Sequence, residues 1–460
     1  MDDRNMEIAR RIAAAVACKG GRTYYVGGFV RDQILGRENK DIDIEVHGVP
    51  LQTLEHILDS LGERLTMGDS FGIMGLRHYE LDIAMPRSEM ATGRGHKDFA
   101  VFVDPFIGEE KAARRRDFTM NALMQDVLNG EILDFFGGRE DMCRSLIRHV
   151  DDISFVEDPL RALRAAQFAA RFGFLIAEET VELSAAMDLA ALPGERVMGE
   201  LEKALLKADK PSIFFEELRR MRQLHDWFPE LEALIGLRQN QNYHPEGDVW
   251  THTMQVLDEA AVLRPSAKKP LWFMLSALCH DMGKAVTTEE INGVFHAYEH
   301  EKKGLGEVKR FLHRLTKETK LTDYVLNMTQ LHMKPNMLVD RGAHTKSYMR
   351  MYDHSVCPEE LLLLARADYM GRVGPESGKE ALISMYTETE RRLREMLALY
   401  RARMREPYLM GRDLVDAGLE PGPLFTEALA YAHKLRLAGR PKEEQLKQAI
   451  SFIRKQNKET

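Results

Sequence analysis

The sequence predicts a multidomain chain in which a mixed α/β head is followed by all-α modules. Short runs typical of strands gather in the first ~140 residues, whereas helical periodicity dominates after residue 145. A length of 460 residues corresponds to about three domains, and a hydrophobic share of 44% is enough to build buried cores. An unfolded tail or a mini-protein is therefore excluded.

Each expected strand alternates apolar and polar residues or is rich in β-branched and aromatic residues. The expected strands are residues 22–26, 40–46, 72–76, 80–85 and 131–135. Strand signals nearly vanish after Gly137-Gly138, and the helical pattern breaks near residues 193–194, 242–245, 371–378 and 418–423. We expect four parts: residues 1–140, 141–235, 236–380 and 381–460.

Charge and composition exclude several classes of protein. A net charge of −8 rules out a wholesale polycation, so any contact with nucleic acid must be local. Residues 302–320 and 431–460 are locally basic, either as solvated surface or as contacts to a polyanion. No apolar stretch approaches the ~20 residues that cross a bilayer, so no membrane span is expected. An acidic start and four widely spaced cysteines favour a cytoplasmic protein.

A glycine turn near the N-terminus is suited to phosphate binding. Gly27 and Gly28 follow a predicted strand and open a helical run that contains Arg31 and Asp32. Paired glycines let a backbone approach a phosphate closely, and the helix N-terminus supplies amide donors. A merely tight connection is the alternative.

The next strand carries two carboxylates on one face. Alternation over residues 41–46 puts Asp41 and Asp43 together, about 7 Å apart, which suits divalent ions. Asp82 on a later strand offers a third carboxylate for a two-Mg²⁺ phosphoryl-transfer site. The alternative is an amphipathic edge strand with a charged outer face, and Glu45 is assigned to that interpretation.

A dense cationic patch follows. Arg114, Arg115 and Arg116 suit the oxygens of a triphosphate, although one of them could equally pair with Asp117. Further on, Asp158 is an ideal N-cap for a helix that begins at Pro159. Such a helix start also makes Asp158 a neighbour of Arg161, and the pair could read the edge of a nucleobase.

A second constellation lies in the helical part of the chain. His280 and Asp281 adjoin at the end of an apolar helix, with His252 and Asp368 elsewhere in the sequence. A lone helical histidine is usually structural, but imidazole plus carboxylate ligands suit a water-activating transition metal. This set predicts a metal site separate from the first one.

Five motifs in order resemble the class II tRNA nucleotidyltransferases, which are the CCA-adding enzymes, and their bacterial poly(A) polymerase relatives. They are VGGFVRD, DIDIE, RRRDFTMNAL, EDPLRALRAAQFAARFGF and GERV, covering roughly residues 22–205. The resemblance implies a polymerase-β-like nucleotidyltransferase head (1–140), a helical neck that recognises the nucleobase (141–235), a metal-dependent module (236–380) and a tRNA-binding tail (381–460).

The resemblance also implies roles for residues of the first site. It assigns the phosphate-binding turn to Gly27, Gly28, Arg31 and Asp32, the Mg²⁺ site to Asp41 and Asp43, and the arginine motif to Arg115, Arg116 and Asp117. The family commonly has an aspartate where this chain has Ala112-Ala113, which is a departure within the arginine segment.

Nucleobase selection is implied for the neck. By the resemblance, Glu157, Asp158 and Arg161, with Arg164 as an addition, read CTP and then ATP without a nucleic-acid template. Residues 86–104 resemble the loop used in switching from C to A addition, and Glu195-Arg196 is expected to brace the neck.

The second constellation resembles an HD-domain phosphohydrolase module. Its ligands would be His252, His280, Asp281 and Asp368, with His300 and His332 as further ligands if the centre is dinuclear rather than mononuclear. The implied substrates are phosphomonoesters or 2′,3′-cyclic phosphates.

The expected function is Mg²⁺-dependent addition of CCA to the 3′ end of tRNA from CTP and ATP, with release of pyrophosphate. One alternative is a poly(A) polymerase or an A-adding enzyme. Another is an HD phosphohydrolase whose head binds nucleotide or RNA. The sequence carries no signature of an oligomeric state.

Overall fold

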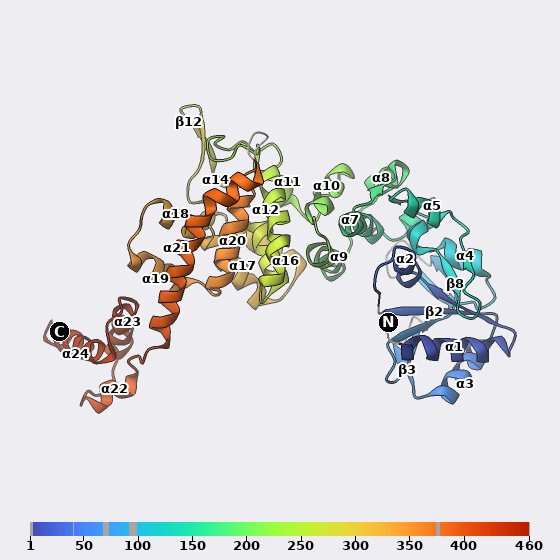
Figure 1. Ribbon diagram of the computed structural model, residues 1–460, viewed down its shortest axis with the longest axis horizontal. Coiled ribbons are helices and arrows are strands. Elements are labelled where there is room, and N and C mark those ends of the chain that lie inside the picture. Colours follow the sequence, from blue (N-terminus) through green and yellow to red (C-terminus); the bar gives the residue numbers. More distant parts are fainter. Residues whose placement is uncertain (1–2, 40, 68–72, 92–98, 374–377, 460) are drawn as a thin grey trace. The chain divides into compact units, whose positions relative to one another are not determined.

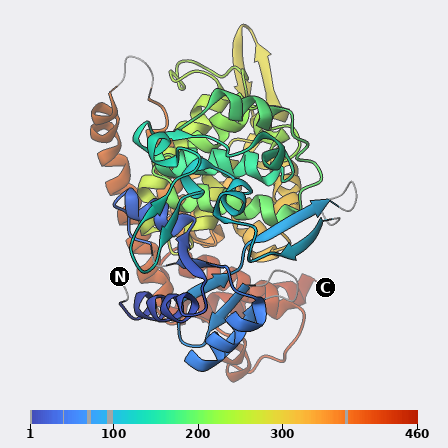
Figure 2. The same ribbon diagram turned by 90° about the vertical axis from the view of Figure 1, so that its right-hand side faces the viewer.

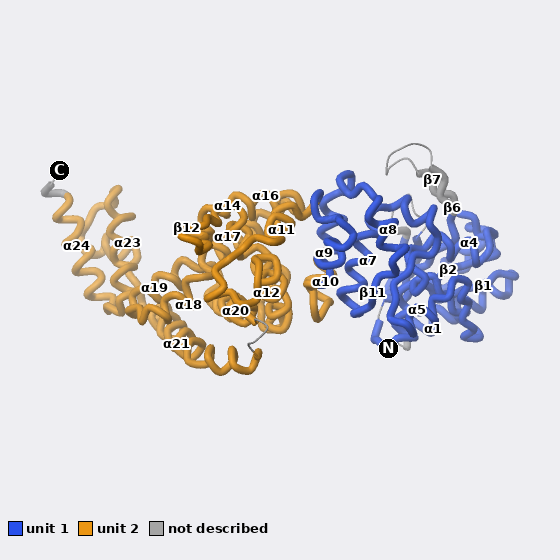
Figure 3. Tube along the Cα trace, turned by 90° about the horizontal axis from the view of Figure 1, so that it is seen from above, with its two compact units in different colours: residues 1–200, 213–226 blue, residues 201–212, 227–460 orange. Residues whose placement is uncertain are grey.

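The computed structural model describes the chain apart from residues 1–2, 40, 68–72, 92–98, 374–377 and 460. The described chain forms two compact units (Figure 3). The first contains Met1–Glu200 and Ile213–Asp226, and the second contains Leu201–Ser212 and Trp227–Thr460. The expected division into four parts remains a prediction.

A seven-stranded sheet organises the first unit, in the order β3-β4-β5-β2-β1-β8-β9 (Figure 1). Its strands are β1 (Arg22–Val26), β2 (Ile42–His47), β3 (Arg64–Met67), β4 (Ile73–Leu76), β5 (Leu81–Ala84), β8 (Met124–Asp126) and β9 (Ile132–Leu133). Only β2 and β5 pair in parallel among the described pairings of this sheet. Packed against β1 and β2 is α1 (Asp3–Ala17), which also contacts α3 (Leu51–Leu61).

The centre of this sheet is where the predicted carboxylate strand lies. Ile42, Ile44 and Val46 are buried, as their alternation predicts. Because β2 has β1 on one side and β5 on the other, it is an interior strand, and the alternative of an amphipathic edge strand is wrong. A separate hairpin of β6 (Arg87–Ala91) and β7 (Phe99–Val103) branches from the sheet.

Short helices complete the first unit. They are α2 (Gly28–Ile34), α4 (Glu109–Arg114), α5 (Gly138–Cys143), α6 (Asp152–Val156), α7 (Leu160–Phe172), α8 (Glu178–Ala185) and α10 (Ser212–Arg220), with a short parallel pair of β10 (Leu146–Ile147) and β11 (Leu175–Ile176). Helix α9 (Gly194–Lys207) runs on into the second unit. Alanines on the inward face of α7, such as Ala162 and Ala166, are fully buried and allow close packing.

Four helices form the core of the second unit: α12 (Val249–Leu263), α13 (Pro270–Cys279), α17 (Thr319–Leu331) and α20 (Pro358–Met370). Helix α13 is buried along most of its length, consistent with its nearly continuous apolar sequence. Around it lie α11 (Pro229–Glu232), α14 (Lys284–Thr287), α15 (His300–Lys303), α16 (Leu305–Leu315), α18 (Lys334–Asp340) and α19 (Thr345–His354). The antiparallel hairpin of β12 (Thr288–Ile291) and β13 (Val294–Ala297) projects from these helices (Figure 2).

The C-terminal part of this unit is helical. The 27-residue α21 (Lys379–Arg405) leads to α22 (Gly411–Asp416), α23 (Leu424–Leu437) and α24 (Lys442–Glu459). A small core that includes Leu414, Ala428 and Ile453 holds these last three helices together. No described helix is long and apolar enough to span a membrane.

The predicted fold class is confirmed: an α/β head is followed by helical modules. Strand 22–26 has the predicted bounds, and the other four expected strands appear with shifted ends. Four strands of the head were not expected, namely β3, β6, β7 and β8. Strands are few among the described residues after 138, as the near loss of strand signals indicates: only the short β10–β11 pair and the β12–β13 hairpin form there.

Candidate functional site

The first site is built on adjacent parallel strands. Asp43 on β2 is the register partner of Asp82 on β5, and Asp41 lies one residue before β2. Burial, together with the neighbouring carboxylates Asp82 and Asp41, raises the pKa of Asp43 to about 6 against the lowering effect of Arg116. The structure therefore brings the three predicted carboxylates into one electrostatically coupled group.

The glycine turn lies against this group. Gly27 has a φ of 64°, which favours glycine, and a Cβ built there would lie 3.4 Å from Arg116 Nη1 and 3.8 Å from Asp43 Oδ2. The bare backbone of Gly27 thus faces both the carboxylates and the arginine motif. The three predicted motifs meet at one place.

Glu45, which we expected on a charged outer face, is instead buried and is only 1% exposed. Its carboxylate lies 3.1 Å from Arg116, 3.5 Å from Arg115 and 3.0 Å from His47. Burial alone would raise the pKa of Glu45, but Arg116 and His47 lower it to about 2. Glu45 is therefore an anion that holds two arginines beside the turn, a function that sequence reasoning missed.

Arg31 and Asp32 lie in the interior rather than at the surface of the turn, exposed by 3% and 1%. Arg31 Nε donates to Asp32 Oδ1 at 2.8 Å, and Arg31 Nη1 donates to Asn121 Oδ1 at 2.7 Å. The guanidinium also packs over Phe168 and Phe172 of α7. In this arrangement the pair ties α2 to α7.

Asp117 is likewise buried. It accepts hydrogen bonds from Asn121 Nδ2 at 2.9 Å and from Arg164 Nε at 2.7 Å. Despite burial, Arg164 and Asn121 hold the pKa of Asp117 below its usual value. Arg164 lies 3.7 Å from Glu200 as well, so it connects the arginine motif to α9.

The predicted base-reading pair lies at the start of α7. Helix α7 begins one residue later than predicted, with Pro159 rather than Asp158 at its N-cap, but Asp158 Oδ1 still accepts from the amide of Leu160 at 3.1 Å. Asp158 Oδ2 accepts from Arg196 at 2.8 Å. Arg161 donates to the carbonyls of Ser154 and Arg115. Arg196 therefore contacts Asp158, which lies within the predicted neck that Arg196 was expected to brace.

Two further predicted features of this site are Glu157 and the switching loop. Glu157 is exposed beside Asp158. Of the predicted switching loop, residues 92–98 lie outside the described residues, which include only the flanking strands β6 and β7. Ala112 and Ala113 are fully buried in α4, so this departure from the family pattern fills a core position.

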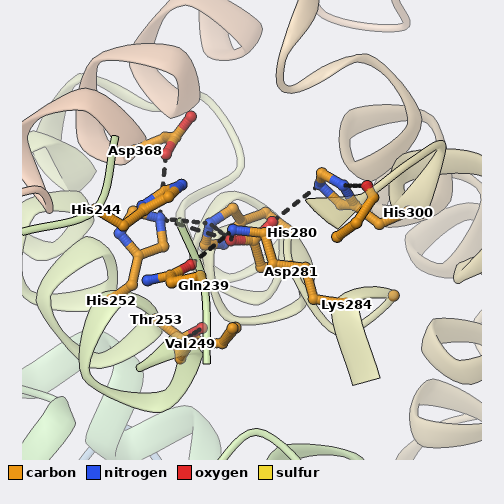
Figure 4. Close-up of polar contacts among 12 residues, drawn as sticks. Gln239, His244, Val249, His252, Thr253, His280, Asp281, Lys284, His300 and Asp368 are labelled. Atoms are coloured by element: carbon orange, nitrogen blue, oxygen red, sulfur yellow. Dashed lines mark hydrogen bonds and ion pairs between the residues drawn. The ribbon is translucent and has the colours of Figure 1, made fainter. Parts of the chain in front are cut away.

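The second constellation converges in the interior of the second unit (Figure 4). His252 Nε2 lies 3.2 Å from Asp368 and 3.6 Å from Asp281 Oδ2, and His280 Nε2 lies 3.3 Å from the same Asp281 oxygen. These four residues, from α12, the end of α13 and α20, are all 5% exposed or less. The ligand set predicted from sequence is assembled.

His300 and His332 join the cluster on the other side of Asp281. Their Nε2 atoms lie 3.0 Å and 3.7 Å from Asp281 Oδ1, whereas His252 and His280 face Oδ2. Asp281 thus has one oxygen toward each histidine pair, an arrangement suited to bridging two cations.

The histidines are oriented by their outer nitrogens. Nδ1 of His280, His300 and His332 bonds to backbone carbonyls at 2.7, 2.9 and 2.6 Å, which leaves each Nε2 facing the cluster. His252 Nδ1 lies 2.7 Å from Glu246, which also bonds His244 Nδ1 at 2.9 Å. Partners of this kind fix the tautomer and ring orientation of histidines that ligate metal.

Electrostatics at this centre follow from burial and pairing. Despite burial, Lys284 and His280 hold the pKa of Asp281 well below its usual range. Asp368 and Glu246 raise the pKa of His252 against the effect of burial, and burial lowers that of His332.

Two functional residues of this centre were not predicted. Lys284 Nζ lies 2.7 Å from Asp281 Oδ2 and 3.0 Å from Gln239, and Glu246 orients His252 as described. Their signals were present, since Lys284 lies three residues after Asp281 and Glu246 lies close before His252. A cavity of about 600 Å³ opens over the cluster and is lined by Asp281, His300, His332 and Asp368 among others.

Family models match three parts of the chain. Residues 23–148 match the poly A polymerase head domain, residues 173–235 the probable RNA and SrmB-binding site of polymerase A, and residues 249–372 the HD domain. Among solved structures, a CCA-adding enzyme in an apo form is 22% identical with a TM-score of 0.66, covering 98% of this chain and 96% of that one. The Thermotoga maritima CCA-adding enzyme complexed with tRNA is 21% identical with a TM-score of 0.62 and the same coverage. These likenesses show a shared fold.

Curated relatives are more similar in sequence. The multifunctional CCA protein of Actinobacillus pleuropneumoniae serotype 5b (strain L20) is 36% identical over 365 residues, which are 77% of this chain and 86% of that protein. The multifunctional CCA protein of Pasteurella multocida (strain Pm70) is 39% identical over 370 residues, 77% of this chain and 85% of that protein. The chain therefore belongs to the family of the multifunctional CCA proteins.

Proposed function

We propose that this chain adds CCA to the 3′ end of tRNA, using CTP and ATP and releasing pyrophosphate. The observation that carries the proposal is the meeting of the Gly27 backbone, the Asp43 carboxylate and Arg116 at one place. Its relatives are named multifunctional CCA proteins, and structures of the same fold are described in complex with tRNA, ATP and CTP.

The first site fits Mg²⁺ by its donor chemistry. Hard carboxylate oxygens converge there, and Asp82 and Asp41 add to the burial that raises the pKa of Asp43, so a divalent cation would offset negative charge at this place. Asp41, Asp43 and Asp82 would hold the ions, which when bound would supply activation of the attacking hydroxyl and stabilisation of the charge that develops.

The other residues would position the nucleotide. The 3′ hydroxyl of tRNA attacks the α-phosphate of CTP or ATP, and pyrophosphate leaves. Arg115 and Arg116, oriented by Glu45, would bind oxygens of the triphosphate. Asp158 and Arg161 would read the edge of the base by hydrogen bonds, because a wrong base leaves polar groups unpaired.

The test is incorporation into tRNA that ends before CCA, with labelled CTP and ATP and Mg²⁺, resolved at single nucleotides. We expect two C residues and one A, with a rate loss of about 10³-fold or more in Asp43→Asn. Asp59→Asn is the matched control, because Asp59 is an exposed partner of Arg64. Absence of incorporation by the wild type, or unchanged rates in Asp43→Asn, contradicts the proposal, and ATP-only tailing of generic RNA identifies a poly(A) polymerase.

We also propose a phosphohydrolase activity of the HD centre, on phosphomonoesters or 2′,3′-cyclic phosphates. The specific observation is that Asp281 faces two histidine pairs with its two oxygens. Imidazole and carboxylate donors fit a divalent transition metal, which when bound would supply an activated water. His252, His280, Asp281 and Asp368 would hold it, with His300 and His332 ligating a second ion.

This activity is tested by phosphate release from nucleoside phosphates with Ni²⁺, Co²⁺, Mn²⁺ or Mg²⁺ added singly. We expect turnover that Asp281→Asn abolishes while CCA addition is retained, since the two sites lie in different units. Turnover unaffected by Asp281→Asn would assign the hydrolysis to another site or to a contaminant.

A further inference from the structure

The cavity over the HD centre has an aromatic wall, which hydrolysis of a phosphate ester does not itself require. His296 of β13 and Tyr298, just after it, both line the cavity. Their rings are stacked, with centroids 5.0 Å apart and planes 8° from parallel. Tyr298 is 60% exposed, so this ring pair offers an uncovered apolar surface.

Cationic groups line the same cavity. Arg238, Arg341, Lys284 and Arg372 all contribute to its wall. Lys284 and Arg372 are paired with Asp281 and Asp368, whereas neither Arg238 nor Arg341 forms an ion pair with any described residue. The Arg238 guanidinium instead lies over the Phe295 ring, 5.9 Å from its centroid. A ligand with both a flat ring and negative charge matches this lining.

The hairpin that carries the aromatic pair is regular. Four register pairs join β12 to β13, and Asn292 and Gly293 connect the strands with positive φ at both positions. This is the two-residue turn that matches the twist of paired strands. The ring pair is therefore displayed on a preformed element, which lowers the entropic cost of binding.

We infer that this hairpin is a nucleobase platform that makes the HD centre selective for nucleotides. The base stacks on the Tyr298–His296 pair while the phosphate reaches the metal-ligand cluster in the same cavity, whose volume of about 600 Å³ lies in the range of nucleotide-sized sites. The substrate class is a phosphate ester of a nucleoside, either free or at the end of an RNA. The inference rests on the phosphohydrolase function proposed above.

The test compares two secondary phosphomonoesters. Adenosine 2′-monophosphate carries a nucleobase, and glycerol 2-phosphate carries none. In Tyr298→Ala we expect the KM for the adenosine ester to rise about tenfold or more, since the adenine base loses its aromatic stacking partner. The kcat/KM for glycerol 2-phosphate stays within about twofold. Tyr298→Phe, which keeps the ring, restores the KM. Val294→Ala changes the KM for neither substrate, because Val294 is on the same strand as His296 but does not line the cavity.

The affinity for adenosine 2′-monophosphate is also measured by calorimetry for the wild type and for Tyr298→Ala. Any binding of this nucleotide at the head is the same in both proteins, so a difference in affinity reports on the HD centre. The inference is contradicted if Tyr298→Ala changes kcat/KM equally for both esters. It is also contradicted if the KM and the affinity for adenosine 2′-monophosphate are unchanged in Tyr298→Ala. If the wild type hydrolyses neither ester with any metal, the hydrolase function fails, and the binding difference alone decides the platform. An oligoribonucleotide with a terminal 2′-phosphate that shows the same KM change identifies an RNA end as the source, and no change there identifies the free nucleotide.

Discussion

Glu45 is the residue that most changes the interpretation of the first site. Its carboxylate is buried between Arg115, Arg116 and His47, and it lies two register positions along β2 from the pair of carboxylates Asp43 and Asp82. A buried anion of this kind fixes two cations at the cost of its own desolvation. Arg115 and Arg116 are thereby oriented before any triphosphate arrives.

Replacing Glu45 by Gln removes that anion. We expect the KM for both CTP and ATP to rise about tenfold with a smaller change in kcat, because the arginines lose their orientation before substrate binds. The measurement is steady-state CCA addition. Glu55→Gln is the control, since it breaks a more exposed pair with Arg64 that contributes little. Equal KM values in the two variants would show that Glu45 does not orient the arginines.

Glu45 also makes stability depend on pH. Its pKa is lowered to about 2 from an ordinary 4.5, so its stabilisation is fully present above pH ~5 and is lost as pH falls from 4.5 toward 2. The lost contribution is on the order of 3 kcal/mol. Chemical unfolding of wild type and Glu45→Gln at several pH values should show a difference in unfolding free energy that narrows toward pH 2. A difference independent of pH contradicts this assignment.

Residues in short motifs could be predicted, whereas those defined by pairing could not. The positions of Asp43 and His280 follow from strand alternation and from a polar pair ending an apolar helix. Alternation placed Glu45 on the polar face, but only the sheet order shows that this face is covered by arginines. Arg31 was assigned to phosphate because of its place in the turn, and its burial against α7 depends on a segment over 130 residues later.

At the scale of elements, two glycines allow α14 and α15 to approach each other closely at the HD centre. Gly283 precedes α14 and Gly304 ends α15, and a Cβ on Gly304 would lie 2.1 Å from the Gly283 Cα. Such a distance is far below van der Waals contact. Because α15 begins at His300, this close approach sets the position of a proposed metal ligand.

Gly304→Ala should therefore separate α14 from α15 and displace His300. We expect loss of HD phosphohydrolysis by about tenfold or more and weaker metal binding by calorimetry, with CCA addition unchanged. Gly306→Ala serves as the control, since the nearest atom to its added Cβ is an Arg310 side-chain nitrogen at 3.9 Å. Unimpaired hydrolysis in Gly304→Ala would mean that the helices tolerate the shift.

The β12–β13 hairpin shows why elements with polar sequences escape prediction. Glu289 and Glu290 interrupt the apolar alternation of β12, and no face of this hairpin covers a large core. Its Asn292-Gly293 turn was the available signal. Long amphipathic segments such as α16 were predictable because burial of one face dictates their period.

At the scale of the whole molecule, the basic C-terminal segment is only partly available to a partner. Arg436 donates to the backbone carbonyls of Arg403, Met404 and Glu406, and Lys442 pairs with Asp413. Lys447 and Arg454 are exposed and lie seven residues apart, so they share a face of α24. This face is the part of the tail suited to contacting a polyanion.

Replacing Lys447 and Arg454 together by Ala should weaken tRNA binding and reduce the slope of log affinity against log salt concentration by about 1.5. Filter binding over a salt series measures this. The control replaces Lys317 and Lys320, exposed in the other basic segment. If only the control pair changes the slope of log affinity against log salt concentration, the tRNA contact lies in the region around α16 and α17 instead.

The ion pair between Asp158 and Arg196 has a consequence for fidelity. In its proposed role, Asp158 is already engaged at 2.8 Å, and Arg161 already donates to two carbonyls. A nucleobase read by this pair would then compete with partners inside the protein rather than enter a vacant complementary surface. A matching base would replace these internal bonds with its own, whereas a base with a mismatched edge would break them and leave polar groups unpaired, so selection would operate as an exchange of bonds.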